Sequence, residues 1–335
     1  MLVTPDAVAA RRAEDALWHA TDAVLLRTGA GGSVPPPRHP ARKAAAHRAG
    51  AGPLHLTAPP ERTASAGEDP AAVPPPRQAA GRWAVDLATP APHLAAAVGR
   101  ALASIPQNRE TKTGTEGPGA VLRGWEPEQA AVLAETAERL DQVWPAMLAE
   151  LHEGVRQIAL LDGRAIDGFT DFTTHGAVFV NAARLTAGRT GLPGWVRLAD
   201  ALVHEGTHTR CNAAAFSTPF LVSATVPGPS VMTPLRPDAR PLTGLFQQTV
   251  VLARQTVLYR LIHRRAPLPD PQREAVAARR VQLLEKAFQG VDTLGRHRAA
   301  LTPAGEAVHA EAAGLLAEEA AREEARTGRL LGGPA

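Results

Sequence analysis

The chain has 335 residues, with 36 basic and 33 acidic side chains, a formal net charge of +3 at pH 7 and a single cysteine. A charge this small, without a basic stripe interleaved with aromatic residues, excludes nucleic-acid binding from the expected functions. One cysteine excludes an internal disulfide framework, and no apolar run has the length of a membrane span or a signal peptide. We therefore expect a cytoplasmic protein with no membrane partner.

The first third of the chain divides by composition. Apolar residues recur at helical spacing over 6–27, which predicts an amphipathic helix and assigns 1–28 to an N-terminal helical segment. Residues 29–81 are rich in Pro, Ala, Gly and Arg, a composition that buries little surface and blocks regular ladders. We expect a linker or surface excursion there, followed over 82–330 by a helical, metal-binding catalytic domain.

The following region is predicted to mix helices with two short strands. Helices are predicted over 92–105 and 126–153, and Pro145 is expected to kink or divide the second. Apolar runs at 156–161 and 176–181, bounded by Gly and Asp, predict strands. Further helices are predicted at 196–216, 242–265, 270–290 and 303–327. The acidic clusters of the last helix predict a solvated face.

The helix at 196–216 contains His204-Glu205-Gly206-Thr207-His208, an HExxH motif. Two histidines four residues apart lie about 40° apart around a helix axis and one turn apart along it. Both imidazoles can therefore reach one divalent metal, with Glu205 beside them to move a proton or steer a water molecule. The alternative is a half-buried helix whose two histidines bind backbone carbonyls. Cys211 on the same helix is either a soft ligand or a small packing residue.

The strand just before this helix suggests how a substrate would bind. A strand followed by a metal helix is the zincin-like order, in which an exposed strand edge pairs with an extended peptide. The alternative is an ordinary strand inside the sheet. The expected fold class is therefore α+β and mostly helical, with a small sheet packed beside a zincin-like HExxH helix.

A zinc peptidase would need a third protein ligand. The histidine that metzincins carry ten residues after the first is replaced here by Ala214, and the helix at 242–265 has no carboxylate. Glu274 and Glu285 on a later helix are the remaining candidates. A zinc-dependent hydrolase is therefore weakened as an interpretation and stays as an alternative.

Two arginines follow the metal helix, at Arg236 and Arg240, and prolines flank both. Guanidinium groups held in this way suit bidentate binding of a carboxylate. The alternative is a surface turn whose arginines cap helix carbonyls.

Residues 176–261 resemble the HExxH-type, 2-oxoglutarate-dependent peptide β-hydroxylases that modify ribosomally made peptides. The resemblance is carried by Asn212-Ala213 and by three stretches, GAVFVN, ADALVHEGTH and PLRPDARPLTGL. It covers about a quarter of the chain. It implies a mononuclear Fe(II) centre, 2-oxoglutarate as cosubstrate, dioxygen, and hydroxylation at the β-carbon of a residue in a precursor peptide.

The resemblance also implies roles for individual residues. His204 and His208 would hold the iron, and Arg240, or else Arg236, would bind the distal carboxylate of 2-oxoglutarate. Glu205 would be a ligand or would orient a water molecule or a histidine, whereas in a peptidase it would be the general base.

One position departs from the family pattern. Where the family has a histidine after the arginine segment, this chain has Phe246-Gln247-Gln248. The Gln247 carbonyl oxygen can bind a hard metal, although more weakly than imidazole does. The centre would then be weaker, use another ligand such as His263, or be degenerate. The last case defines a further alternative, a catalytically silent peptide-binding relative.

Overall fold

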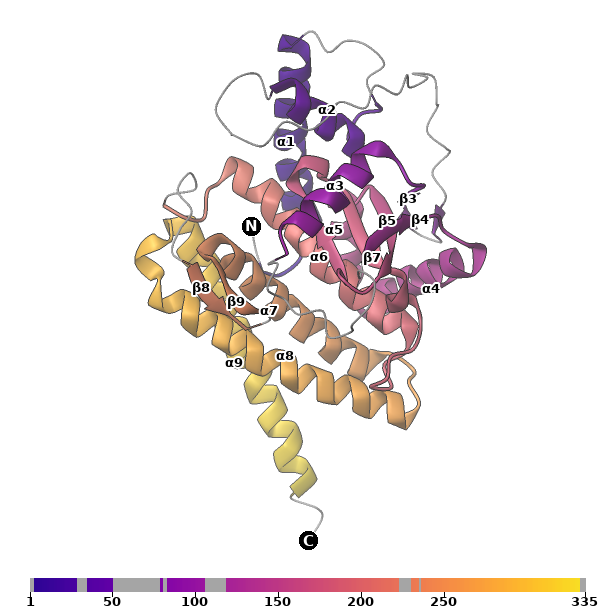
Figure 1. Cartoon of the computed structure of the whole chain (residues 1–335). Coiled ribbons are helices and arrows are strands. Elements are labelled where there is room, and N and C mark those ends of the chain that lie inside the picture. The colour runs from indigo at the N-terminus through magenta and orange to yellow at the C-terminus, as the bar shows by residue number, and fades with distance from the viewer. Residues whose placement is uncertain are drawn as a thin grey trace.

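The structure, a computed structural model, describes residues 3–28, 35–50, 79–80, 83–105, 119–222, 230–234 and 236–331, without the side chains of 79–80, 236–238 and 326–331. Helices dominate the described chain and surround a small mixed sheet (Figure 1). The expected α+β, mostly helical class is confirmed. None of the described helices combines the length and the apolarity needed to cross a membrane.

The main sheet is centred on β5 (Gln157–Gly163). On one side β5 pairs in parallel with β7 (Ala177–Asn181), and on the other with β3 (Asp86–Leu87) and, antiparallel, with β4 (Ala120–Arg123). The two predicted strands are confirmed as β5 and β7. An additional strand, β6 (Gly168–Thr170), pairs antiparallel with the outer side of β7. The strand before the metal helix is the ordinary strand inside the sheet, one of the two expected alternatives, because the chain folds back through β6 and covers its outer edge; the alternative of an exposed edge on this strand is wrong.

The helices that precede β5 in the chain follow the predicted pattern, apart from α2. Pro145 divides the helix predicted at 126–153, because proline cannot supply an amide to the preceding turn. These elements are α1 (Ala7–Arg27), α2 (Pro40–Gly50), α3 (Pro92–Ala103), α4 (Pro127–Val143) and α5 (Pro145–Gly154), with a short β1 (Ala79–Ala80) and β2 (Trp83–Ala84) pair between α2 and α3.

The N-terminal helix α1 packs on α5 and on α6 (Gly194–Ser217) through a buried face that includes polar groups. The Glu14 carboxylate accepts a hydrogen bond from the Trp18 indole N–H at 3.0 Å and lies 2.9 Å from His175 Nε2. Both Glu14 and His175 are almost completely buried. The N-terminal helix is thus joined to the sheet region through its side chains.

Helix α2 lies inside the segment expected to be a linker or surface excursion, so residues 40–50 form a regular element where none was expected. Ala44 and Ala46 are buried, and the Lys43 ammonium lies 4.7 Å from the centre of the Phe172 ring. Small alanine side chains and the aliphatic stem of a lysine cover apolar surface that a count of large apolar residues does not detect. The remainder of the expected linker at 29–34 and 51–78 lies outside the described residues.

The second half of the chain is a helical layer with one hairpin. Helix α6 lies between the sheet and α7, and α8 and α9 pack against the far side of α7 (Figure 1). The four predicted helices are confirmed as α6 (Gly194–Ser217), α7 (Leu242–Arg265), α8 (Asp270–Arg296) and α9 (Pro303–Leu331). The arginine segment forms β9 (Arg236–Pro241), which pairs antiparallel with β8 (Ser230–Thr233).

A buried ion pair joins α5, α7 and the start of the chain. Glu150 accepts hydrogen bonds from both terminal nitrogens of Arg254, at 2.5 and 3.1 Å, and from the Asp6 backbone N–H at 2.8 Å. Arg254 also donates from Nε to the Val3 carbonyl. Arg210 Nε lies 3.9 Å from the same carboxylate, and burial lowers the Arg210 pKa. Two buried cations therefore depend on Glu150.

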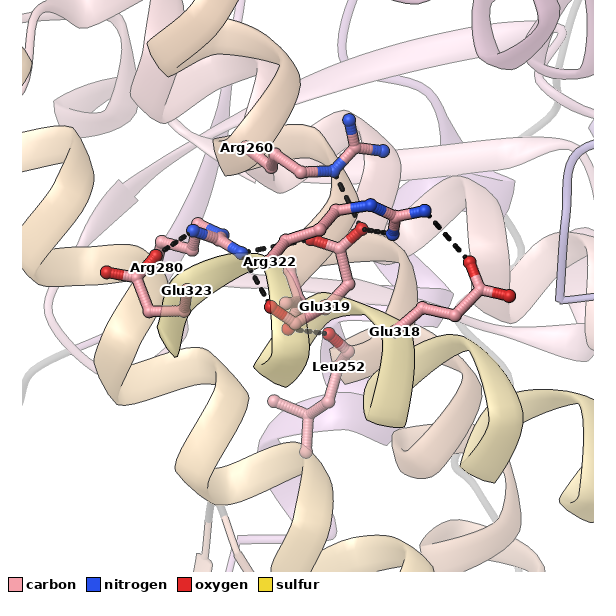
Figure 2. A network of polar contacts seen from close by, with 8 residues as sticks. Leu252, Arg260, Arg280, Glu318, Glu319, Arg322 and Glu323 are labelled. Carbon is pink, nitrogen blue, oxygen red and sulfur yellow. Dashed lines mark hydrogen bonds and ion pairs between the residues drawn. The ribbon is translucent and has the colours of Figure 1, made fainter. Parts of the chain in front are cut away.

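The acidic face of α9 is not entirely solvated, contrary to expectation. Figure 2 shows Glu319 held by three guanidinium groups from three helices. Arg260 of α7 and Arg322 of α9 donate to Oε1 at 2.7 and 3.0 Å, and Arg280 of α8 donates to Oε2 at 3.1 Å. Only 1% of the Glu319 side chain is exposed. Its charge is needed to neutralise the arginines where α7, α8 and α9 meet.

Candidate metal centre

Helix α6 places the two motif histidines side by side. The ring centroids of His204 and His208 lie 5.0 Å apart, and their planes are inclined by 58°. Both residues are only partly buried, although they stand in a helix that is otherwise largely buried. Two imidazoles at this separation and exposure suit one metal ion reached from solvent.

Glu205 lies between the histidines and the edge strand. Its side chain is 7% exposed, and Oε1 is 4.0 Å from His204 Nε2. On β6, an added Cβ at Gly168 would lie 3.0 Å from Glu205 Oε1 and 3.1 Å from the Phe179 carbonyl oxygen. Glycine is therefore the residue that lets the edge strand approach this carboxylate. The sequence did not point to Gly168, because its role depends on a contact between distant segments.

Helix α5 packs closely against the middle of the HExxH motif. An added Cβ at Gly206 would lie 2.1 Å from Leu151 Cδ2, so glycine here allows α5 to pack closely against α6. Leu151 is itself buried. The motif helix is thus held in place on the side away from the histidine rings.

Helix α7 contributes a second layer of polar contacts. Gln247 Oε1 lies 2.7 Å from His208 Nδ1, and Gln247 Nε2 donates to Asn212 Oδ1 at 2.9 Å. Two turns further along α7, Gln255 Nε2 donates to Asp200 Oδ1 at 2.6 Å. The residue numbers of His208 and Gln247 add up to the same value as those of Asp200 and Gln255. This is expected where two antiparallel helices keep one alignment along their contact.

Asp200 and Asn212 are site residues to which the sequence analysis gave no role in the centre. Burial raises the pKa of Asp200, which faces α7 one turn before His204. The sequence did carry a signal, because Asp200, His204, His208 and Asn212 recur at every fourth position. Such a stripe places polar groups along one side of a helix, and it marks the side of α6 that α7 covers.

Arg240 lies on the covered face of the hairpin. It is directly opposite Val231, which is buried, and residues opposite one another in an antiparallel pair project to the same face. An added Cβ at Gly244 would lie 3.7 Å from Arg240 Cβ, which sets this arginine over the first turn of α7, about one turn before Gln247. The side chain of Arg236 lies outside the description.

Of the four other candidate ligands, three are placed away from the centre. Glu274 and Glu285 are exposed on α8, which packs on α7 and α9. His263 is sixteen residues beyond Gln247 on α7, about 24 Å along the axis at 1.5 Å per residue. Cys211 is buried among the apolar side chains of the core, which favours a packing role, and burial raises its pKa to about 12.

The side chains around His204 and His208 provide some, but not all, of the ligands that a metal ion needs. Within the described ranges, no group of three His, Cys, Asp or Glu side chains is arranged to hold a metal ion. The two imidazoles supply nitrogen donors of the kind that iron and zinc accept. A metal held by His204 and His208 would take its other ligands from Glu205, from a bound cosubstrate or from water.

Comparison with known proteins adds no relative. No family model matches the chain, and no curated protein matches its sequence. The functional interpretation therefore depends on the motif resemblance and on the geometry of α6, β6, α7 and the β8–β9 hairpin.

Gly168→Ala is expected to lower the free energy of unfolding by about 1–3 kcal/mol, because the new methyl group would press on buried Glu205 and on a strand carbonyl. Urea unfolding measures this. Gly99→Ala is the control: its added Cβ meets nothing within 4 Å, and alanine favours the helix by about 1 kcal/mol. Equal stability of the Gly168 variant and the parent would mean that Glu205 is loosely packed.

Proposed function

We propose that the chain is an Fe(II)- and 2-oxoglutarate-dependent oxygenase that hydroxylates the β-carbon of a residue in a peptide. The observation that carries the proposal is the paired, partly exposed His204 and His208 on α6. Arg240 supports it from the covered face of the adjacent hairpin. The motif resemblance described above supplies the reaction type.

The resemblance implies a role for each residue, and the positions of the residues on α6 and on the hairpin are compatible with these roles. His204 and His208 would hold the metal, and Arg240 would bind the distal carboxylate of 2-oxoglutarate, with Arg236 as the second candidate. Glu205, buried beside His204, would be a ligand or would fix the position of a water molecule. When bound, iron, 2-oxoglutarate and dioxygen supply the oxidising power that hydroxylates a C–H bond.

The peptide would lie along β6. This strand pairs with β7 on one side, and no strand lies beyond it among the described residues. An extended peptide that adds to this edge would pass beside Gly168, where Glu205 approaches the sheet. The precursor peptide is therefore the partner that we propose for this site.

A zinc-dependent hydrolase is the second candidate, and one observation favours it. A buried Glu205 with Oε1 4.0 Å from His204 Nε2, beside an edge strand, is suitably placed for a general base acting on a metal-bound water. The exposed positions of Glu274 and Glu285 count against it, because neither faces α6 to supply the third ligand. A peptide-binding relative without activity would bind no stoichiometric metal.

Anaerobic reconstitution with Fe(II), followed by optical titration with 2-oxoglutarate, tests the proposal. A weak visible charge-transfer band that saturates with the cosubstrate is the expected result. Absence of the band together with one tightly bound zinc would favour the hydrolase. Absence of both the band and any metal would favour the silent relative.

Arg240→Ala is expected to raise the concentration of 2-oxoglutarate needed for half-saturation by about 10–100-fold, the effect of losing one charge-assisted carboxylate contact. The metal content should stay unchanged, since the arginine is not a ligand. The same titration measures both quantities. Arg264→Ala, an exposed arginine near the far end of α7, is the control. Unaltered cosubstrate dependence in the Arg240 variant would refute this role for Arg240.

A further inference from the structure

We propose that Gln247, held by Asn212, is a positioning residue that sets the tautomer and ring orientation of His208, and that it is not a metal ligand. This inference rests on the proposed metal centre. Its evidence is a chain of two hydrogen bonds, 2.7 Å between His208 Nδ1 and Gln247 Oε1 and 2.9 Å from Gln247 Nε2 to Asn212 Oδ1.

The orientation of the two amides in the structure gives these hydrogen bonds their direction. Asn212 Oδ1 can only accept, so it takes the Nε2 hydrogen of Gln247 and turns the Oε1 of Gln247 towards His208. An amide oxygen in turn requires a hydrogen on Nδ1 of the ring. A neutral imidazole protonated on Nδ1 carries its lone pair on Nε2, which is the nitrogen that would bind the metal.

The same contacts argue against Gln247 as a ligand. Its oxygen is directed at His208 Nδ1 and its nitrogen at Asn212, so both ends of the amide already serve the helix–helix contact. Binding a metal through Oε1 would draw the oxygen from Nδ1 and leave the ring without its orienting partner. These two hydrogen bonds thus account for a glutamine at the position where the resembling family has a histidine.

The surroundings hold Gln247 in place. Phe246, the preceding residue, stacks on Phe220 with centroids 5.0 Å apart and planes inclined by 15°. The Gln255–Asp200 hydrogen bond of 2.6 Å fixes the same α6–α7 register two turns away. A side chain fixed in this way can impose a ring orientation on His208 before any metal binds.

The first test is the tautomer of His208 in the metal-free protein. Long-range ¹H–¹⁵N spectra at a pH where the ring is neutral distinguish Nδ1–H from Nε2–H, and the signal that disappears in His208→Ala identifies the residue. We expect Nδ1–H in the parent chain and in Gln247→Glu, which keeps an acceptor oxygen. We expect a mixture of tautomers in Gln247→Leu. An Nε2–H ring in the parent would mean that both amides are turned over, and it would overturn the proposal whether or not a metal binds.

The second test is Co(II) binding, followed by the visible spectrum. Gln247→Leu is expected to weaken Co(II) binding by about 10–100-fold, as losses of partners to ligating histidines do. At saturation its band positions should equal those of the parent, since the ligand set is the same. Gln247→Glu should bind Co(II) with the affinity of the parent chain, because it keeps an acceptor oxygen for His208. A changed spectrum at saturation would show that Gln247 is a ligand and would overturn its positioning role.

Gln248→Leu is the matched control, because Gln248 is the next residue on α7, is equally half-buried, and its Oε1 has no hydrogen-bond partner among the described residues. It should bind Co(II) as the parent does, and an equal loss in both variants would overturn the specific role of Gln247. If the parent protein binds no metal but its His208 carries the hydrogen on Nδ1, the proposed function is refuted. The hydrogen bonds from His208 through Gln247 to Asn212 are then still supported. The two failures are therefore distinguishable.

Discussion

His208→Ala is expected to abolish stoichiometric metal binding. Its imidazole is one of the two that α6 places side by side, 5.0 Å between ring centroids, so its loss leaves a single histidine of the motif on α6. Removing a partner of a ligating histidine already costs about 10–100-fold in affinity, and removal of the ligand itself should cost more. Metal analysis after dialysis against a defined Fe(II) or Zn(II) buffer measures the result.

His208→Ala tests where the metal binds and does not distinguish iron from zinc, because the oxygenase and the hydrolase both need this histidine. His263→Ala serves as the control, since that residue lies about 24 Å along α7 from Gln247 and should not affect metal content. Wild-type metal content in His208→Ala would place the metal elsewhere in the chain and would contradict both enzymatic interpretations.

Glu150→Gln is expected to lower the free energy of unfolding by about 3–5 kcal/mol, the cost of leaving buried charges without their counter-ion. Arg254 would lose the carboxylate that binds both of its terminal nitrogens, and Arg210 would lose the negative charge 3.9 Å away. Both guanidinium groups are buried, so water cannot replace the lost interaction. Urea unfolding followed by circular dichroism measures the change.

Two further variants make this prediction specific. Glu153→Gln, on the same helix, removes the partner of Arg11, whose side chain is 65% exposed, and should change stability little. The double variant Glu150→Leu with Arg254→Met should recover part of the loss, because it removes both charges together and fills the space with apolar groups. A Glu150→Gln chain as stable as the Glu153→Gln chain would contradict the buried ion-pair interpretation.

The sequence predicted the helices well for identifiable physical reasons. Apolar spacing and proline act locally, and Pro145 divides α4 from α5 where expected because the cause lies in the residue itself. The motif spacing likewise predicted that His204 and His208 lie together, since one helix turn determines that distance.

Features that depend on contacts between distant segments could not be predicted in the same way. The strand β6 covers β7 and places Gly168 beside Glu205. A strand of three residues is too short to have a pattern that predicts this pairing. The contact of Gln247 with His208 depends on the register of α6 against α7, which the spacing within one helix does not define. For α2 and Glu319, composition indicated exposure, whereas alanine packing and three guanidinium groups account for their burial.

The polar side chains of α7 have a consequence for how this part of the molecule can move. They reach partners in three directions, from Gln247 and Gln255 to α6, from Arg254 to α5 and the start of the chain, and from Arg260 to α9. An apolar helix can slide or rotate by one residue and still bury similar surface, but here such a step would break all of these contacts at once. We infer that α7 has one permitted alignment and behaves as a fixed axis, so that any opening of the site to a peptide must come from the elements around it.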